Sequence, residues 1–273
     1  MKAVLLARGL GSRMKQAGDA PLTPDQAAAA AAGAKGMMPI GHGRPFLDYV
    51  LSALADAGCT SVCLVVAPDH EAIREYYDGD GRPSRLAIHY AIQPIADGTA
   101  RAVRSAESFA GGDPFLVLNS DNLYPVSAIR ALRALDGSGL AVFERERLLA
   151  TSNFTRQRVS AFATLRVSSG GWLEAIVEKP GGLEAGGGRP EAGEPVLLSM
   201  NLWRFSPGIF EACREVPLSS RGERELPQAV GWAIARRGER FRGIPCEEGV
   251  LDLSTRADVA AVERLLEGVE VRP

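Results

Sequence analysis

The residues LARGLGSRM at positions 6–14 combine two glycines with two arginines directly after a short apolar run. Glycines in such a turn let backbone N–H groups approach a phosphate, and an arginine adds a fixed fork of donors for its oxygens. The stretch does not fit the dinucleotide fingerprint, because Met14 stands where a third glycine is required. No Gly-Lys-Ser/Thr follows at the Walker spacing either. The turn therefore predicts a phosphate-binding loop of another kind.

Two aspartates stand where apolar strands are expected to end. Asp121 comes near the end of PFLVLNSDN (114–122), and Asp252 near the end of GVLDL (249–253). Carboxylate oxygens together with phosphates are the ligands that Mg²⁺ prefers. From the residues alone, each aspartate could equally cap the turn or helix that follows it.

Histidine and cysteine offer no comparable pattern. The three histidines show no metal-ligand spacing, so structural roles are expected for His42, His70 and His89. The four cysteines have neither the CxxC spacing of a zinc ribbon nor the density of a disulfide scaffold. They are expected to be reduced and mostly buried.

Strands and helices alternate in the first half of the chain, where they must position these residues. Strands are expected at 2–7, 61–68, 85–93 and 114–122, with helices at 46–58, 70–77 and 98–110. This alternation predicts parallel strands joined by crossover helices.

After about residue 140 the pattern changes to strands joined by tight turns. Strand-forming stretches are expected at 140–146, 158–180 and 195–206, with Gly170-Gly171 at a hairpin tip. Helices at 207–216 and 225–238, a strand at 249–253 and a last helix at 255–268 follow. The whole predicts a Rossmann-like, three-layer α/β/α fold with a mixed, mostly parallel central sheet.

Two further stretches stand apart. The segment 181–195 has six glycines and two prolines, which predicts a mobile loop. The segment TPDQAAAAAAGAKG begins with Thr23 and Pro24, has Gln26 three residues after the threonine, and reaches Gly33 at its end. These residues predict a short helix with a capping box.

Composition bounds the class of protein. The 273 residues are 46% hydrophobic and 23% charged, with a net charge of −2, which describes an ordinary globular chain. No broad basic surface is available, so nucleic acid is not expected as a partner. No apolar stretch approaches the roughly 20 residues of a membrane span, so no membrane partner and a cytoplasmic location are expected.

LARGLGSRM followed by AKGMMPIG resembles the signature of sugar-phosphate nucleotidylyltransferases, the nucleotide-sugar pyrophosphorylases typified by glucose-1-phosphate thymidylyltransferase and uridylyltransferase. Further matches follow in the family's order: QPIADGTARAV, FLVLNSDN, AIVEKP, MNLWRF and VLDLSTRADV. The resemblance covers the chain to about residue 262. It implies a single nucleotidyltransferase domain over residues 1–273, with a nucleotide-binding half (1–140) and a sugar-phosphate-binding half (141–273).

The resemblance also implies roles for individual residues. The catalytic cations would be Arg13, Lys35 and Lys179. The nucleotide-binding residues would be Ala7, Gly9, Gly11, Ser12, Gln93, Gly98 and Thr99, of which Gln93 and Gly98 meet the base. The sugar-phosphate-binding residues would be Asn119, Glu178, Lys179 and Asn201. The ligands of Mg²⁺, the implied cofactor, would be Asp121 and Asp252.

The chain departs from the family pattern in three places. Ala34 replaces the usual proline before Lys35, and Ser120 precedes Asp121 in place of a glycine. The gap between Arg13 and Lys35 is about ten residues longer than the family's, and the predicted capped helix fills it. We expect that helix to be a lid or a contact surface that carries Lys35.

The implied reaction is Mg²⁺-dependent transfer from a nucleoside triphosphate, with dTTP or UTP favoured, to a sugar 1-phosphate. No general base is needed, because the second pKa of a phosphate monoester is about 6 and its oxygen is already anionic at neutral pH. Three alternatives remain: a non-sugar phosphate or phosphonate acceptor, a glycosyltransferase, and a non-catalytic nucleotide-sugar-binding module. The glycosyltransferase usually has an Asp-x-Asp motif, whereas NSDN has one aspartate. A homo-oligomer is left open.

Overall fold

The computed structural model describes residues 1–9, 11–16, 18, 20–41, 43–177 and 194–273. These residues form one mixed sheet of nine strands. Its strands are β1 (Lys2–Leu6), β4 (Ser61–Val66), β5 (Ala87–Ile92), β6 (Phe115–Asn119), β8 (Ser138–Glu144), β9 (Thr164–Val167), β10 (Leu173–Val177), β11 (Leu197–Phe205) and β12 (Phe241–Cys246).

The core of the sheet is parallel, as predicted. Its strand order is β6-β1-β4-β5, and the register sets Leu6 of β1 beside Asn119 of β6 and Val65 of β4. Because parallel strands end at the same edge, the segments after β1, β5 and β6 meet there. This edge is where the phosphate loop and Asp121 were expected.

The second half extends the same sheet, and that prediction is also confirmed. Strand β11 runs antiparallel to β6, β8 and β9, and β9 pairs with β10 in a hairpin. Strand β12 was not predicted; it pairs parallel to β8, and on its other side it makes an isolated bridge from Arg242 to Trp172. Gly243 and Pro245 weaken its sequence pattern, and proline is tolerated there because β12 lies at an edge.

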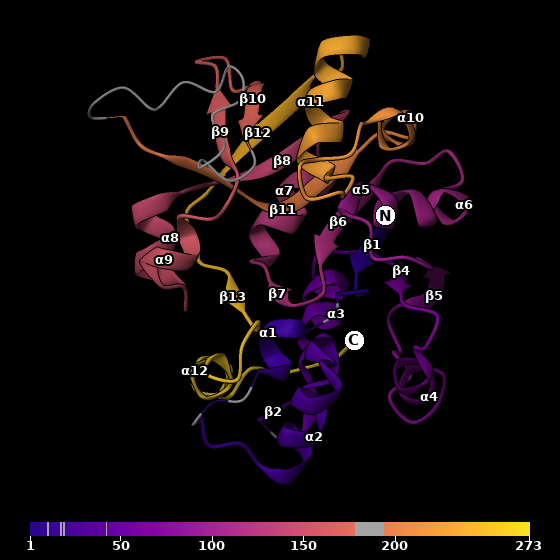
Figure 1. Ribbon diagram of the computed structural model, residues 1–273, viewed down its shortest axis with the longest axis vertical. Coiled ribbons are helices and arrows are strands. Elements are labelled where there is room, and N and C mark those ends of the chain that lie inside the picture. The colour runs from indigo at the N-terminus through magenta and orange to yellow at the C-terminus, as the bar shows by residue number, and fades with distance from the viewer. Residues whose placement is uncertain (10, 17, 19, 42, 178–193) are drawn as a thin grey trace.

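Helices cover both faces of the sheet (Figure 1). Along β1, Ala3 and Leu5 pack into one hydrophobic cluster with α3 (Phe46–Asp56), while Val4 packs into a second cluster with α5 (Thr99–Ser105). This alternation is what a sheet buried between two helical layers requires. The other helices are α1 (Ser12–Lys15), α2 (Pro24–Ala32), α4 (Glu71–Asp78), α6 (Glu107–Ala110), α7 (Val126–Arg133), α8 (Arg145–Thr151), α9 (Arg156–Val159), α10 (Ile209–Glu215), α11 (Leu226–Arg237) and α12 (Asp258–Leu265).

The segment between β8 and β9 corrects the sequence prediction. Strand-forming residues were expected from 158, but α9 occupies Arg156–Val159 and β9 begins only at Thr164. The Thr155 side chain caps α9 by accepting from the N–H of Arg158, which fixes a helical turn that apolar periodicity does not reveal. Helices α7 and α8 were likewise not predicted.

The capped helix is confirmed as α2. Thr23 and Gln26 form both bonds of a capping box, and Gly33 ends the helix in the left-handed conformation. The buried Gln26 side chain also donates to Glu263 of α12 and to the carbonyl O of Pro39. The helix is therefore packed against the rest of the chain and leads into the 3-10 turn η1 (Lys35–Met37).

Two short strand pairings complete the fold. Strand β2 (Pro39–Ile40) pairs with β3 (Arg44–Pro45), and β7 (Asn122–Leu123) pairs with β13 (Leu251–Asp252). All four cysteines are free, and three of them are buried. Across the described ranges, no helix has the length and apolar character needed to cross a bilayer. Of the expected glycine-rich loop, residues 181–193 lie outside the described part of the chain.

Candidate active site

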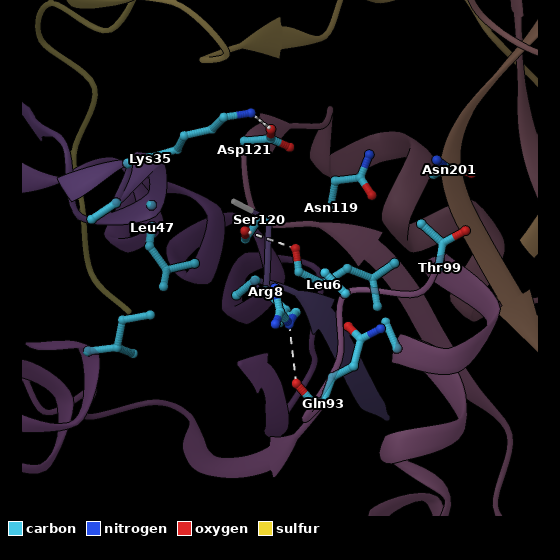
Figure 2. A pocket seen from close by; sticks show the side chains of 18 of the residues that line it. Leu6, Arg8, Lys35, Leu47, Gln93, Thr99, Asn119, Ser120, Asp121 and Asn201 are labelled. Atoms are coloured by element: carbon cyan, nitrogen blue, oxygen red, sulfur yellow. Dashed lines mark hydrogen bonds and ion pairs between the residues drawn. The ribbon is translucent and has the colours of Figure 1, made fainter. Parts of the chain in front are cut away.

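A cleft of about 490 Å³ opens at the carboxyl edge of the parallel strands. It is lined by residues 6–9 at the end of β1, Gln93 and Gly98 after β5, residues 119–121 at the end of β6, and residues 33–37. Figure 2 shows Lys35 and Asp121 at one end of the cleft, Gln93 at the opposite end, and Arg8 between them. The cleft thus has a charged end and an amide end.

The charged end is an ion pair. Lys35 Nζ lies 2.9 Å from Asp121 Oδ2, and the two side chains are 16% and 23% exposed. Lys35 lies in η1, two residues after the cap of α2, and Asp121 comes two residues after the end of the buried strand β6. An ion pair that is partly open to solvent contributes only about 0–1 kcal/mol to folding. Its charges are therefore free to change partners when a polyanion enters the cleft.

The glycine loop lies between these ends. Ala7, Gly9 and Ser12 line the cleft, whereas Gly11 lies behind it with a φ of 62°. A Cβ at Gly11 would overlap the carbonyl O of Gly33, so the loop packs directly on the cap of α2. Arg13 is exposed and outside the cleft lining, and its guanidinium donates to Ser254 Oγ over 3.4 Å.

We expect Gly11→Ala and Gly9→Ala to have opposite consequences. The first variant loses about 1–3 kcal/mol of stability, because alanine is strained at positive φ and its Cβ meets Gly33. The second keeps the wild-type stability, since a Cβ at Gly9 finds open space, but it narrows the cleft and weakens nucleotide binding. Thermal unfolding and nucleotide titration measure both effects. Equal melting temperatures for the two variants would contradict this packing.

The amide end is built around the buried side chain of Gln93. Its Nε2 donates to the carbonyl O of Gly98 over 3.1 Å and to Asp97 Oδ1 over 3.4 Å. Both amide hydrogens are used in this way, so the carbonyl Oε1 is the group that Gln93 can offer a ligand. Gly98 has a φ of 114°, and its backbone lies against Arg224, which leaves no room for a Cβ.

Asn201 lines the cleft from within β11, where the backbone of the strand is irregular and strained. It is the one non-glycine residue with positive φ, 57°, in the described ranges, and it lies where the pairing of β11 with β8 shifts register. Nearby, Tyr124 donates to the carbonyl O of Met200 over 2.5 Å. Burial, with a smaller contribution from the charge of Asp121, raises the pKa of Tyr124, so this hydroxyl stays protonated. Strain of this kind is retained where a side chain must be aimed.

The backbone of Asp252 lies near that of Asp121 in space, but Asp252 is outside the cleft lining. Strand β13 sets Asp252 opposite Asn122, and the N–H of Leu253 donates to the carbonyl O of Asp121 over 2.9 Å. The Asp252 carboxylate is buried, and its Oδ1 accepts from Asn122 Nδ2 and from Ser254 Oγ.

The second oxygen of Asp252 is paired with Arg158 of α9, which also holds Asp258 over 2.8 Å. Mg²⁺ takes one or two carboxylates together with substrate phosphates, so Asp121, which faces the cleft, fits such an ion. Asp252 fits as a second ligand only when Arg158 releases its oxygen. Within the described ranges, no group of three or more His, Cys, Asp or Glu side chains could hold a metal.

The cleft therefore brings together most of the residues to which the sequence resemblance assigns a role. Those that line it are Ala7, Gly9, Ser12, Lys35, Gln93, Gly98, Thr99, Asn119, Asp121 and Asn201. Those outside its lining are Gly11, Arg13 and Asp252. Glu178 and Lys179 lie outside the described residues.

Two charged residues that line the cleft, Arg8 and Glu223, were not predicted from the sequence. Arg8 belongs to the glycine loop, so its place in that motif was the signal that could have found it. Glu223 enters from the loop before α11, and no local motif marks it. Its position depends on a tertiary contact, in which the N–H of Arg224 donates to the carbonyl O of Asp97.

Comparison with known proteins adds a family and a fold. A family model described as Nucleotidyl transferase matches residues 2–240. A UTP–glucose-1-phosphate uridylyltransferase from Haloferax volcanii is 27% identical over 272 residues, covering 98% of this chain and 97% of the relative. A glucose-1-phosphate thymidylyltransferase from Streptomyces antibioticus is 30% identical over 273 residues, covering 100% of this chain and 68% of the relative.

Solved structures show the same fold. A UDP-glucose pyrophosphorylase complexed with UDP-glucose matches with a TM-score of 0.74 at 18% identity, over 98% of this chain and 99% of that one. A UTP-bound enzyme of this name from Acinetobacter baumannii matches with a TM-score of 0.71 at 19% identity, over 99% and 95% of the two chains.

Proposed function

Since the chain belongs to the nucleotidyl transferase family, we propose that it joins a nucleoside monophosphate to a sugar 1-phosphate and releases pyrophosphate. The triphosphate is UTP or dTTP, and the product is a nucleoside diphosphate sugar. The names of the curated relatives, uridylyltransferase and thymidylyltransferase, support both the acceptor class and the choice of base.

The observation that carries the proposal is the ion pair of Lys35 and Asp121 at one end of a cleft whose other end is Gln93. A cation and a carboxylate at one end suit phosphates and a divalent ion, while a buried amide at the other suits a planar base. The glycine loop between them offers backbone N–H groups to a triphosphate.

Each side chain then has a defined task in the proposal. Gln93 and Gly98 hold the base, with Ala7 and Thr99 beside them, and the loop with Gly9, Gly11 and Ser12 holds the triphosphate. Asn119 and Asn201 bind the sugar from the cleft, and the sequence resemblance adds Glu178 and Lys179 to the sugar-phosphate ligands. Lys35 contacts the α-phosphate and the incoming phosphate, and Arg13 adds a cation at the loop. Asp121 holds Mg²⁺, with Asp252 as the second carboxylate once Arg158 gives up its oxygen.

The chemistry needs positioning and charge neutralisation more than proton transfer. The attacking phosphate oxygen is already anionic, so no side chain has to act as a base. The chain must bring two polyanions into line and offset their repulsion, which Lys35 does at the charged end. Asp121 would hold Mg²⁺ in the cleft, and the ion would supply positive charge for the departing pyrophosphate.

The test is pyrophosphate release across the nucleoside triphosphates, each with Mg²⁺ and a panel of sugar 1-phosphates. We expect release with UTP or dTTP only when a sugar 1-phosphate is present. Release that needs no acceptor would mean hydrolysis, and release only with a non-sugar phosphate would replace the proposed acceptor class.

A further inference from the structure

We propose that Arg8 selects the nucleobase, by donating to a ring oxygen that keto bases carry and amino bases lack. The inference rests on the proposed function for the orientation of the nucleotide in the cleft. It adds a specificity-determining residue that neither the sequence motif nor the family assignment provides.

Arg8 is held at the amide end of the cleft. Its Nε donates to the carbonyl O of Gln93 over 3.2 Å, and its Nη2 donates to the carbonyl O of Pro94 over 3.4 Å. Figure 2 shows its side chain directed toward Gln93 and away from Lys35 and Asp121. A guanidinium anchored twice is preorganised, because part of its rotamer entropy is already lost.

Arg8 keeps free donors in this position. An arginine carries five N–H groups and no acceptor, and the two bonds to Gln93 and Pro94 use two of the five. The side chain lines the cleft and is partly exposed. A ligand group that meets it must therefore be an acceptor.

Gln93 offers the opposite polarity beside it. Its Nε2 is committed to Gly98 and Asp97, so Oε1 is the atom left to accept a hydrogen bond from a ligand. An acceptor from Gln93 next to a donor from Arg8 matches a base edge in which a ring N–H adjoins a C=O. Uracil, thymine and guanine have that edge, whereas cytosine and adenine present an unprotonated ring nitrogen beside an amino group.

The orientation fixes which oxygen Arg8 reads. In the proposed function the phosphates lie at the end of the cleft with Lys35 and Asp121, so the ribose-linked side of the base faces that end. Arg8 starts between the two ends, and its guanidinium is held on the side opposite Lys35 and Asp121 by the carbonyl groups of Gln93 and Pro94. It therefore meets the ring position farthest from the ribose, which is the oxygen at C4 of a pyrimidine or C6 of a purine.

A purely structural role gives a different signature. If Arg8 only joined the glycine loop to the segment after β5, its loss would weaken the binding of every nucleotide equally. If Arg8 selects the base, its loss weakens only the binding of nucleotides whose base carries the keto oxygen. Comparing UTP with CTP and GTP with ATP separates the two roles, because each pair differs at this edge of the ring.

The test is equilibrium binding of these four triphosphates, without any sugar phosphate, to wild type, Arg8→Ala, Arg8→Lys and Arg104→Ala. Arg104 is an exposed arginine on α5 outside the cleft lining and serves as the matched control. We expect Arg8→Ala to weaken the binding of UTP about 10- to 100-fold and that of CTP by no more than about twofold. The loss for UTP is the effect of removing one hydrogen bond from a charged donor. Arg8→Lys recovers part of the preference for UTP over CTP, and Arg104→Ala keeps all of that preference.

Equal weakening of UTP and CTP, or no change in their ratio, would overturn the role of Arg8. The proposed function fails separately, through absence of pyrophosphate release with every sugar 1-phosphate. Because binding is measured without an acceptor, the two failures are distinguishable.

Discussion

Replacing Asp121 by asparagine lowers kcat/KM for the triphosphate by about 10²- to 10³-fold, the loss typical for removing one group that stabilises developing charge. The variant keeps the shape of the side chain but removes the negative charge 2.9 Å from Lys35. It also removes the carboxylate that fits Mg²⁺ in the cleft. Steady-state kinetics at varied Mg²⁺ concentration measure the loss, and a higher requirement for Mg²⁺ should accompany it.

The chain contains a matched control for this variant. Lys2 and Asp113 form an ion pair that is also 2.9 Å long, at the opposite edge of the same parallel strands. Asp113 is 66% exposed and lies outside the cleft lining, so Asp113→Asn should leave kcat/KM unchanged. Asp121→Asn with wild-type kinetics and an unchanged Mg²⁺ requirement would remove Asp121 from the mechanism.

Replacing Lys35 by methionine has the second large effect, a fall of about 10²-fold or more in kcat/KM. The variant keeps the apolar stem but loses the cation that offsets the repulsion between triphosphate and acceptor. Arginine should not restore activity, because its planar fork cannot replace a compact ammonium at a crowded site. The melting temperature should change little, since Lys35 and Asp121 are both partly exposed.

Lys2→Met is the corresponding control and should retain full activity, because Lys2 lies at the start of β1, away from the cleft. Measuring the KM of each substrate separately adds a second check. A loss confined to the triphosphate KM, with kcat unchanged, would contradict a role for Lys35 at the reacting phosphates.

The fold was predictable where local pattern and tertiary packing agree. Buried apolar runs gave the parallel core, and the residues of the capping box in 23–33 gave α2 almost to its bounds. The pattern failed where short elements depend on their partners. Strand β12 contains a glycine and a proline and is held by β8, and α9 is a single turn fixed by Thr155. Neither element has enough periodicity to be found without the rest of the fold.

The cleft was predictable to the extent that strand ends mark it. Gln93, Asn119 and Asp121 lie at or just after the ends of strands that meet at one edge, so their proximity follows from parallel topology. The surroundings of Asp252 did not follow, because Arg158 reaches it from a helix 94 residues away in sequence. Arg8 was visible as a residue of the motif, but its direction depends on the carbonyl groups of Gln93 and Pro94.

The central claim is that the α-phosphate of the triphosphate moves to a sugar 1-phosphate in this cleft. The most direct measurement follows UTP or dTTP labelled at the α-phosphate, with Mg²⁺ and a sugar 1-phosphate, in wild type and Asp121→Asn. We predict that the label appears in a nucleoside diphosphate sugar with wild type and stays in the triphosphate with the variant. Label in free nucleoside monophosphate, or an equal yield of the sugar nucleotide from both proteins, would contradict the account.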